Sequence, residues 1–319
     1  MGQRPGAVVT KTAFVFPGQG SQSVGMGKAL YDAFPEAKAV FEAADDALHE
    51  KLSTLCFTGP EDALKRTANT QPAILTVSIA AHAVFTRRSG LAPAFVAGHS
   101  LGEYSALVAA QAMTLPDAVR AVRARGTFMQ EAVPAGLGAM SAVLGLAPEK
   151  VAELCAQAAQ GEVVSCANFN DPSQTVIAGH VKAVERAGEL LKAAGAKRVL
   201  PLPVSAPFHC ALMQPVVPRL EGVLTAFKNP IVPVVSNVEA TPNGEGARVK
   251  ELLLRQVTGS VRWLESVQAM EKAGVTRVIE LGPGKVLCGL VKRIGKSIEC
   301  LNVEDPASLE KTLAALGGA

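Results

Sequence analysis

The chain has no block of like charges and no long apolar run. Its 31 Lys and Arg residues nearly balance 28 Asp and Glu residues, giving a net charge of +3 over 319 residues. A nucleic-acid-binding surface normally concentrates basic residues, so this balance argues against such a partner. The most apolar stretch, residues 73–85, is broken by Thr76, Ser78 and His82 and is too short to span a bilayer. We therefore expect neither a nucleic-acid partner nor a membrane partner.

Cysteine is also sparse, and its spacing argues against two kinds of site. The six cysteines include no C-x-x-C pair, and no cluster with metal-ligand spacing occurs. A chain of this size does not need a disulfide framework. The N-terminus lacks the continuous apolar segment of a signal peptide. The expected protein is cytoplasmic, with reduced thiols, no bound metal, and residues 1–10 as a loose N-terminal tail.

The order of predicted strands and helices indicates an α/β fold with an insertion. Hydrophobic residues make up 49% of the chain, which is enough for a large core. Strands alternate with helices over residues 11–134 and 205–305, which predicts one discontinuous α/β domain with a mostly parallel sheet. The elements expected in it include helices at about 71–87 and 211–227, a strand at 275–281 and, as the last element, a helix after residue 284. Residues 135–204 instead show the order β-α-β-β-α-β of a complete ferredoxin-like unit. We therefore predict a small ferredoxin-like α+β subdomain inserted into the larger domain.

The central motif is G-H-S-L-G at residues 98–102. Residues 93–97 predict a strand just before it, and residues 103–110 predict a helix just after it. The flanking glycines permit the tight turn between the two. Such an elbow exposes the serine hydroxyl and points the N–H groups of the helix start at the atom it attacks. We predict that Ser100 is a nucleophile in an α/β-hydrolase-like domain; the alternative is a packing turn with an inert serine.

A second glycine-rich loop, residues 17–22, follows a predicted strand at 11–16. The loop lacks the third glycine of G-x-G-x-x-G and the G-K-[ST] of a P-loop. Neither a dinucleotide site nor a phosphate site is therefore expected. A loop in this position can still expose backbone N–H groups and supply half of an oxyanion hole.

A serine nucleophile needs a base, and the chain has five histidines. His99 adjoins the serine and should point away from it, whereas His209 lies in a loop that a compact sheet can bring to the elbow. An α/β-hydrolase carries an acid between serine and histidine. No acid stands out at a strand end there, since Asp171 is typical of a turn. The residues favour a Ser-His dyad with the histidine oriented by a carbonyl. Cys210 is a weak alternative nucleophile, because adjacent side chains seldom face one another.

One arginine lies on the inward face of a predicted helix at residues 115–132. That face, read at helical spacing, comprises Ala118, Val122, Arg125 and Met129. An arginine on a buried face needs an anion, either from the protein or from a ligand. The residues alone leave both a structural salt bridge and a bound substrate open.

Six motifs together resemble the bacterial malonyl-CoA:acyl carrier protein transacylase family. The resemblance runs from about Thr12 to about Arg293. The motifs follow the family's order and fall at residues 16–22, 98–104, 125–130, 167–174, 205–209 and 282–287. Six motifs in one order are far more specific than any single motif, and the small inserted domain is similar as well.

The resemblance implies a role at each matched position. Ser100 would carry the acyl group, and His209 would act as its general base and then as general acid toward the leaving thiol. Arg125 would bind the free carboxylate of malonate, and Gln256 would help to orient His209. The position of Cys210 is often a serine in the family, and this departure affects no essential residue.

The resemblance also implies an oxyanion hole and a reaction. The backbone N–H groups of Gln19 and Leu101 would form the hole. The enzyme would move malonyl from malonyl-CoA to the pantetheine thiol of acyl carrier protein by ping-pong kinetics, for fatty acid synthesis. It would need no cofactor beyond the coenzyme A thioester. Two alternatives are a serine thioesterase or hydrolase of acyl-CoA and a non-catalytic module that binds carrier protein.

Basic side chains cluster around the second helix of the predicted small domain. An acidic carrier protein could dock on them, although a solvated helix face explains the same pattern. The residues concerned are Lys182, Arg186, Lys192, Lys197 and Arg198.

Overall fold

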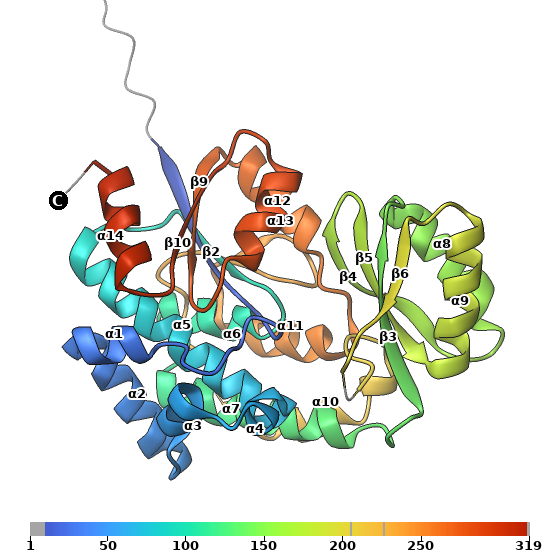
Figure 1. Ribbon diagram of the computed structural model, residues 1–319, viewed down its shortest axis with the longest axis horizontal. Coiled ribbons are helices and arrows are strands. Elements are labelled where there is room, and N and C mark those ends of the chain that lie inside the picture. The colour runs from blue at the N-terminus through green and yellow to red at the C-terminus, as the bar shows by residue number, and fades with distance from the viewer. Residues whose placement is uncertain (1–9, 205, 226, 318–319) are drawn as a thin grey trace, which may run out of the picture.

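Two separate sheets organise the chain (Figure 1). The structure is a computed structural model that describes residues 10–204, 206–225 and 227–317. Residues 1–9 of the expected N-terminal tail therefore lie outside the described residues. The order of the elements confirms a mixed α/β fold with one mostly parallel sheet and one antiparallel sheet.

The larger sheet has six strands in the order β10-β9-β1-β2-β7-β8. Neighbours are parallel from β10 to β7, and only β8 runs antiparallel to its neighbour. The strands are β1 (Lys11–Phe16), β2 (Phe95–Gly98), β7 (Val234–Val235), β8 (Pro242–Asn243), β9 (Val275–Leu281) and β10 (Glu299–Val303). The sheet is covered on both faces, which is why β1 is a nearly continuous apolar run.

The two faces of the larger sheet carry different helices. Phe14 and Phe16 point from β1 into the larger core, and Ala13 and Val15 point into the smaller one. The larger core is formed with α1 (Lys28–Ala33), α2 (Pro35–Leu48), α3 (Leu52–Thr58), α4 (Glu61–Lys65), α5 (Thr67–Ser89), α6 (Gly102–Ala109), α7 (Leu115–Glu131), α10 (Val216–Glu221), α11 (Gly246–Thr258) and α14 (Pro306–Ala315). The smaller core is formed with α12 (Trp263–Lys272) and α13 (Val286–Ile294).

The second sheet has four antiparallel strands in the order β4-β5-β3-β6. Its strands are β3 (Gly138–Leu144), β4 (Val164–Asp171), β5 (Gln174–His180) and β6 (Arg198–Pro201). The helices α8 (Pro148–Ala159) and α9 (Val181–Ala193) pack against it and share a separate core. In Figure 1 this unit lies beside the larger sheet, with α8 and α9 on its far side.

Strand β4 joins the two units. The N–H of Phe169 donates to the carbonyl of Val261 at 2.9 Å, and the N–H of Val261 donates to the carbonyl of Ala167 at 2.8 Å. An ion pair between Arg293 Nε on α13 and Asp171 Oδ2 at 2.5 Å adds a second connection. The small unit is therefore fixed against the larger one along one edge.

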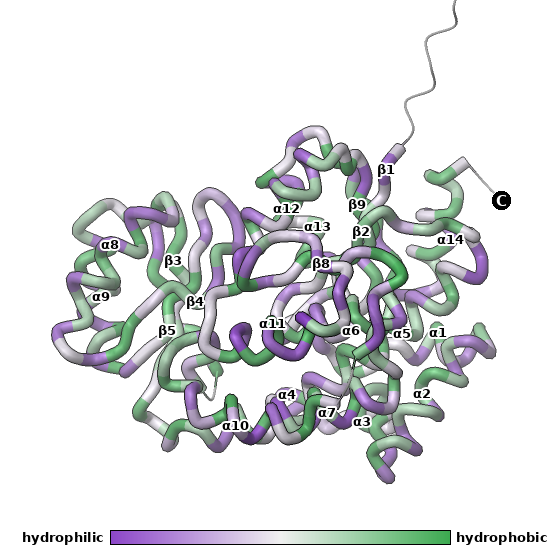
Figure 2. Tube along the Cα trace, turned by 180° about the vertical axis from the view of Figure 1, so that it is seen from behind, coloured by the Kyte–Doolittle hydropathy of each residue, from purple (hydrophilic) through white to green (hydrophobic). Residues whose placement is uncertain are grey.

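The helices combine apolar and polar residues, as the alternating green and purple of Figure 2 shows. Such amphipathic helices cover a core on one side and meet solvent on the other. In the part of the chain that the structure describes, no helix is long and apolar enough to cross a membrane.

Two expected helices have other bounds in the structure, and two elements were not predicted. Helix α5 begins at Thr67, before the expected start at Gln71, and contains Pro72. The helix expected over residues 211–227 shortens to a 3-10 turn, η1 (Ala211–Met213), and α10, because Pro215 and Pro218 lack the N–H groups that a longer helix needs. Strand β10 and helix α14 follow the last element that the sequence predicted.

Candidate active site

Ser100 stands at a sharp turn between β2 and α6. Its φ of 51° lies in the left-handed region, which a serine adopts only at a cost of roughly 1–3 kcal/mol. A Cβ on Gly98 would lie 1.9 Å from the backbone carbon of Gly102, and a Cβ on Gly102 would lie 2.1 Å from the carbonyl oxygen of Phe16. The two glycines of the motif are therefore required by the close approach of three backbone segments.

The structure brings His209 to Ser100. His209 Nε2 lies 2.7 Å from Ser100 Oγ, and His209 Nδ1 lies 2.8 Å from the backbone carbonyl oxygen of Gln256. A carbonyl only accepts, so Nδ1 carries the proton and Nε2 is left to accept the serine hydroxyl. Burial, followed by the positive charge of Arg125, lowers the pKa of His209 to about 3. The resting imidazole is therefore neutral, as a general base must be.

Arg125 reaches the same point from α7. Arg125 is 2% exposed, and Met129, one turn further along the same face of the helix, is 1% exposed. Nη1 donates to Gln71 Oε1 at 2.8 Å, while Nη2 donates to Gln256 Oε1 at 2.9 Å and to Ser100 Oγ at 3.1 Å. Among the described residues no carboxylate pairs with this guanidinium directly. The structural salt bridge that the sequence left open is thus absent there.

Close packing of two helices sets the position of that arginine. A Cβ on Gly126 of α7 would lie 2.6 Å from the carbonyl oxygen of Thr67 on α5. The absence of a side chain lets α7 approach α5, which carries Gln71. Gln71 is 1% exposed and also directs its amide nitrogen toward Met129 Sδ at 3.9 Å.

Gln19 lines the same cavity as Ser100, and Leu101 is the next residue in the chain. Gln19 lies in the loop after β1, and Leu101 directly follows the nucleophile at the start of α6. Neither N–H donates to another backbone group within residues 10–204, 206–225 and 227–317. Two N–H groups without an internal partner are what an oxyanion hole offers.

Sequence reasoning missed the polar residues behind the serine. Asn237 follows β7; its Oδ1 accepts from the Ser100 N–H at 2.8 Å, and its Nδ2 donates to the Gly98 carbonyl at 2.7 Å. Glu103 belongs to the motif at residues 98–104, but no role was predicted for it; its Oε2 accepts from Gln256 Nε2 at 2.7 Å. Strand β7 is next to β2, so the carboxyl end of β7 was the available signal for Asn237.

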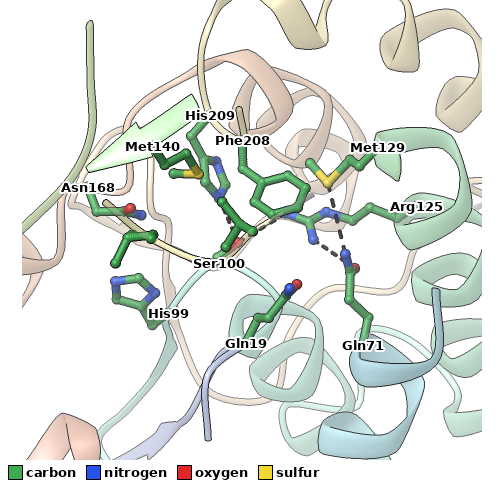
Figure 3. A pocket seen from close by; sticks show the side chains of 12 residues that line it. Gln19, Gln71, His99, Ser100, Arg125, Met129, Met140, Asn168, Phe208 and His209 are labelled. Carbon is green, nitrogen blue, oxygen red and sulfur yellow. Dashed lines mark hydrogen bonds between the residues drawn. The ribbon is translucent and has the colours of Figure 1, made fainter. Parts of the chain in front are cut away.

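These groups open into a cavity of about 120 Å³ (Figure 3). The large-sheet unit provides the polar side and the small unit provides Met140 and Asn168. Figure 3 shows Arg125, Ser100 and His209 converging, with Phe208 and Met140 above the serine. His99 points away from His209 and binds Asn170 of β4 through Nε2, at 2.8 Å from Oδ1.

The alternative nucleophile, Cys210, is engaged elsewhere, and no metal-binding group is found among the described residues. The thiol of Cys210 is buried and donates to the carbonyl of Pro207 at 3.1 Å, and burial raises its pKa to about 11. It is therefore a neutral structural thiol. In the described part of the chain, no group of His, Cys, Asp and Glu could hold a metal ion.

The basic residues of the small unit differ in how free they are. Arg186 donates to the carbonyls of Ala158 and Ala159 at the end of α8, at 2.9 and 3.0 Å, and pairs with Glu162 at 2.8 Å. Lys192 is half exposed, and among the described residues its ion pair is with its neighbour Glu189. Arg186 thus connects α9 to the end of α8, whereas Lys192 has no such link between helices.

Comparison with known proteins places this geometry in a family. The family model described as the acyl transferase domain matches residues 13–312. A malonyl CoA-acyl carrier protein transacylase from Escherichia coli strain K12 is 49% identical over 307 residues, 96% of this chain and 99% of that protein. A protein of the same name from Bacillus subtilis strain 168 is 50% identical over 311 residues, 97% of this chain and 98% of that protein.

Solved structures agree with these relatives. An acyl carrier protein S-malonyltransferase from Vibrio cholerae has a TM-score of 0.93 and 50% identity, covering 95% of this chain and 100% of that one. A malonyl-transacylase in complex with its type II PKS acyl-carrier protein has a TM-score of 0.93 and 47% identity, covering 96% of this chain and 100% of that one.

Proposed function

Because this chain belongs to the malonyl-CoA:acyl carrier protein transacylase family, we propose that it transfers malonyl from malonyl-CoA to the phosphopantetheine thiol of an acyl carrier protein, for fatty acid synthesis. The observation that carries the proposal is the buried Arg125, whose Nη2 lies 3.1 Å from Ser100 Oγ and whose partners among the described residues are all neutral groups. A site that holds a cation at the nucleophile without a protein anion favours an acyl group with its own carboxylate.

The first half-reaction loads the serine. Ser100 Oγ gives its proton to His209 Nε2 and attacks the thioester carbonyl carbon. The N–H groups of Gln19 and Leu101 stabilise the oxyanion, at about 3 kcal/mol for each donor. The C–S bond then breaks, and the proton on His209 passes to the departing thiolate of coenzyme A. A malonyl ester of Ser100 remains.

The second half-reaction unloads it. His209 Nε2 takes the proton of the pantetheine thiol, and the thiolate attacks the ester carbonyl. The ester C–O bond breaks, and the proton returns to Ser100 Oγ. Both thiols use one site in turn, so the kinetics are ping-pong. Since a thioester is an activated donor, a Ser-His dyad oriented by the Gln256 carbonyl suffices without a triad acid.

Arg125 supplies selectivity in this scheme. The malonyl carboxylate accepts two hydrogen bonds from the guanidinium fork and takes over bonds that the neutral amides of Gln71 and Gln256 receive in the free enzyme. Acetyl has no such group and would leave the buried cation unpaired. Both effects favour malonyl.

The remaining assignments concern the domains, the cellular location and the cofactors. We assign residues 11–134 and 205–305 to an α/β-hydrolase-like domain, in which Ser205 and Ala226 lie outside the described residues. We assign residues 135–204 to a ferredoxin-like insertion. The strand order β4-β5-β3-β6 supports the ferredoxin-like assignment. We also propose that the enzyme is cytoplasmic and needs no cofactor beyond its thioester substrates.

A groove next to the active site supports carrier docking on the small unit. It measures about 850 Å³ and shares Met140 and Leu202 with the Ser100 cavity. Its charged lining residues are Lys182, Glu185, Arg186, Glu189 and Lys192. An acidic carrier would meet the two lysines while its pantetheine arm reaches the serine. The guanidinium of Arg186 is already bonded to the end of α8, so we expect Arg186 to contribute less to docking than the lysines.

The release of coenzyme A tests the proposed function. With malonyl-CoA alone, we expect a burst of free thiol equal to the enzyme present and then a stop. Addition of carrier protein should give continuous release and malonyl-carrier product. A hydrolase would release thiol continuously without carrier, and a non-catalytic binding module would release none. Either of these two results contradicts the proposal.

A further inference from the structure

The carboxylate of Glu103 lies behind the catalytic groups, and the reaction described above does not use it. Glu103 is in the first turn of α6 and is 3% exposed. Its Oε2 accepts from Gln256 Nε2 at 2.7 Å and from the Asn237 N–H at 3.1 Å. Among the described residues it forms no salt bridge. Burial of a carboxylate without a direct ion pair is costly, so its retention next to a nucleophile points to a role.

Gln256 connects this carboxylate to the reacting groups. The residue is fully buried. Its side-chain Nε2 donates to Glu103 and also to the Ser100 carbonyl oxygen, the latter at 3.0 Å. Its Oε1 accepts from Arg125 Nη2 at 2.9 Å. Its backbone carbonyl accepts from His209 Nδ1. A carboxylate only accepts hydrogen bonds. Glu103 therefore fixes the amide with nitrogen toward itself and oxygen toward Arg125.

The charges on either side of Gln256 are complementary. Arg125 is cationic, and His209 becomes cationic each time it takes a proton. The charge of Arg125 is, after burial, the next largest cause of the lowered pKa of His209. Burial also lowers the pKa of Arg125, and the negative charge of Glu103 opposes that change. A negative charge behind Gln256 thus offsets the two positive charges in front of it.

We propose that Glu103 is a positioning residue that supplies, through Gln256, the negative charge that a triad carboxylate supplies by direct contact with histidine. The proposal rests on the proposed function for the identity of the substrate, but not for the nucleophile and base it supports. In this view the acid missing from the Ser-His dyad is displaced by one residue: the side-chain amide of Gln256 contacts Glu103, and the backbone carbonyl of Gln256 holds His209.

This role predicts a defined kinetic pattern. Loss of the charge weakens proton uptake by His209, so kcat falls for malonyl and acetyl donors alike. The cation of Arg125 is less compensated, so KM for malonyl-CoA does not rise. The malonyl-to-acetyl ratio of kcat/KM is retained, in contrast to the effect of removing Arg125. A residue that merely packs would change stability without this pattern.

The experiment compares Glu103→Gln, which keeps the shape and removes the charge, with a matched control. Glu280→Gln neutralises another buried glutamate, whose carboxylate accepts from the N–H groups of Leu287 and Cys288 on α13. The first readout is the rate of Ser100 sulfonylation by phenylmethylsulfonyl fluoride, a neutral probe that needs neither malonyl-CoA nor carrier. It stays informative even if malonyl transfer itself is not observed. The pH is 8, because burial raises the pKa of Glu103 to about 7.

For Glu103→Gln we expect sulfonylation and kcat to fall by about tenfold or more, with the control within about twofold of wild type. Circular dichroism confirms folding. A folded Glu103→Gln that reacts within about twofold of wild type overturns the proposal.

A second set of variants keeps the test decisive if Glu103→Gln does not fold. Gln256→Met removes the connecting amide but keeps the backbone carbonyl that holds His209. Glu103→Asp keeps the charge with a shorter reach. We expect Gln256→Met to lose about the same factor in sulfonylation as the loss of the charge, and Glu103→Asp to retain more rate than Gln256→Met. A folded Gln256→Met within about twofold of wild type overturns the link.

Discussion

The two sheets contribute different things to one cavity. The parallel sheet and its helices provide groups that donate, accept or carry charge, among them Ser100 and Arg125. The antiparallel unit mainly provides side chains that bound the space, such as Met140 of β3. Reactivity and shape are therefore built by separate parts of the chain, so substitutions on the two sides should have different effects on rate and on acyl-group preference.

Topology explains why the reactive groups lie on the parallel side. Strands β1, β2 and β7 are adjacent and parallel, so the segments after them meet at one edge. Those segments carry Gln19, Ser100 and Asn237. The carboxyl edge of a parallel sheet is the usual place for such a site. The small unit reaches this edge through the contact of Asn170 with His99.

The largest effect should come from the base on the reactive side. His209→Ala removes the acceptor of the serine proton, and we expect kcat to fall by roughly four powers of ten or more. The loss should be the same from about pH 6 to about pH 8. The pKa of His209 is lowered to about 3, so the wild-type base is already neutral over this whole range. Steady-state rates at three pH values measure it. A loss of less than about tenfold would place the base elsewhere.

Arg125→Ala should change selectivity as well as rate. Removal of one partner of a buried charged pair costs ~3–5 kcal/mol, so kcat/KM for malonyl-CoA should fall by roughly two to four powers of ten. The kcat/KM for acetyl-CoA should fall little or should rise. Arg125→Lys should restore only part, because it lacks the planar fork. If the malonyl-to-acetyl ratio stays within a factor of ~3 of wild type, the carboxylate role is wrong.

Met140→Ala should change shape without changing chemistry. The side chain is 5% exposed and lines the cavity, so truncation enlarges the space next to Ser100. We expect malonyl transfer to stay within about tenfold of wild type while a branched donor, methylmalonyl-CoA, gains about tenfold in kcat/KM. The fold should lose about 2–5 kcal/mol, measurable by denaturant unfolding. Equal losses for both donors would contradict the division between the two sheets.

The smallest effects should come from the basic helix of the small unit. Lys192→Glu should raise KM for the carrier a few-fold at low salt, since one exposed charge pair is worth about 1 kcal/mol or less. KM for malonyl-CoA should not change. Arg186→Ala should instead lower the melting temperature, because it removes the bonds to the end of α8. If Arg186→Ala raises the carrier KM without loss of stability, our separation of these two residues fails.

How far the sequence predicted this arrangement depended on the range of the interactions. The elbow at Ser100 and the inward face of α7 follow from spacing within one turn or one helix, and both were predicted. Strand β9 was predicted with the bounds that it has in the structure. The dyad needed a choice among histidines, and the resemblance to a family supported the choice of His209. Local patterns therefore identified the residues, but not their contacts.

The missed residues act over long separations in the chain. Gln71 meets Arg125 from 54 residues away, and Asn237 meets Ser100 from 137 residues away. Helical or strand periodicity does not encode such pairs, because they arise only when β2 and β7 align and α5 packs on α7. The start of α5 was missed for a related reason. Pro72 indicated a helix start at Gln71, but packing extends the helix back to Thr67, four residues before Gln71.

The intact mass of the protein after mixing with malonyl-CoA in the absence of carrier tests whether Ser100 carries the malonyl group. The account predicts an added mass of one malonyl group, located on the peptide that contains Ser100, and its loss when carrier protein is added. Ser100→Ala should keep its fold by circular dichroism and gain no mass. A malonyl adduct that persists in Ser100→Ala, or a folded wild-type protein that gains no mass, would contradict the account.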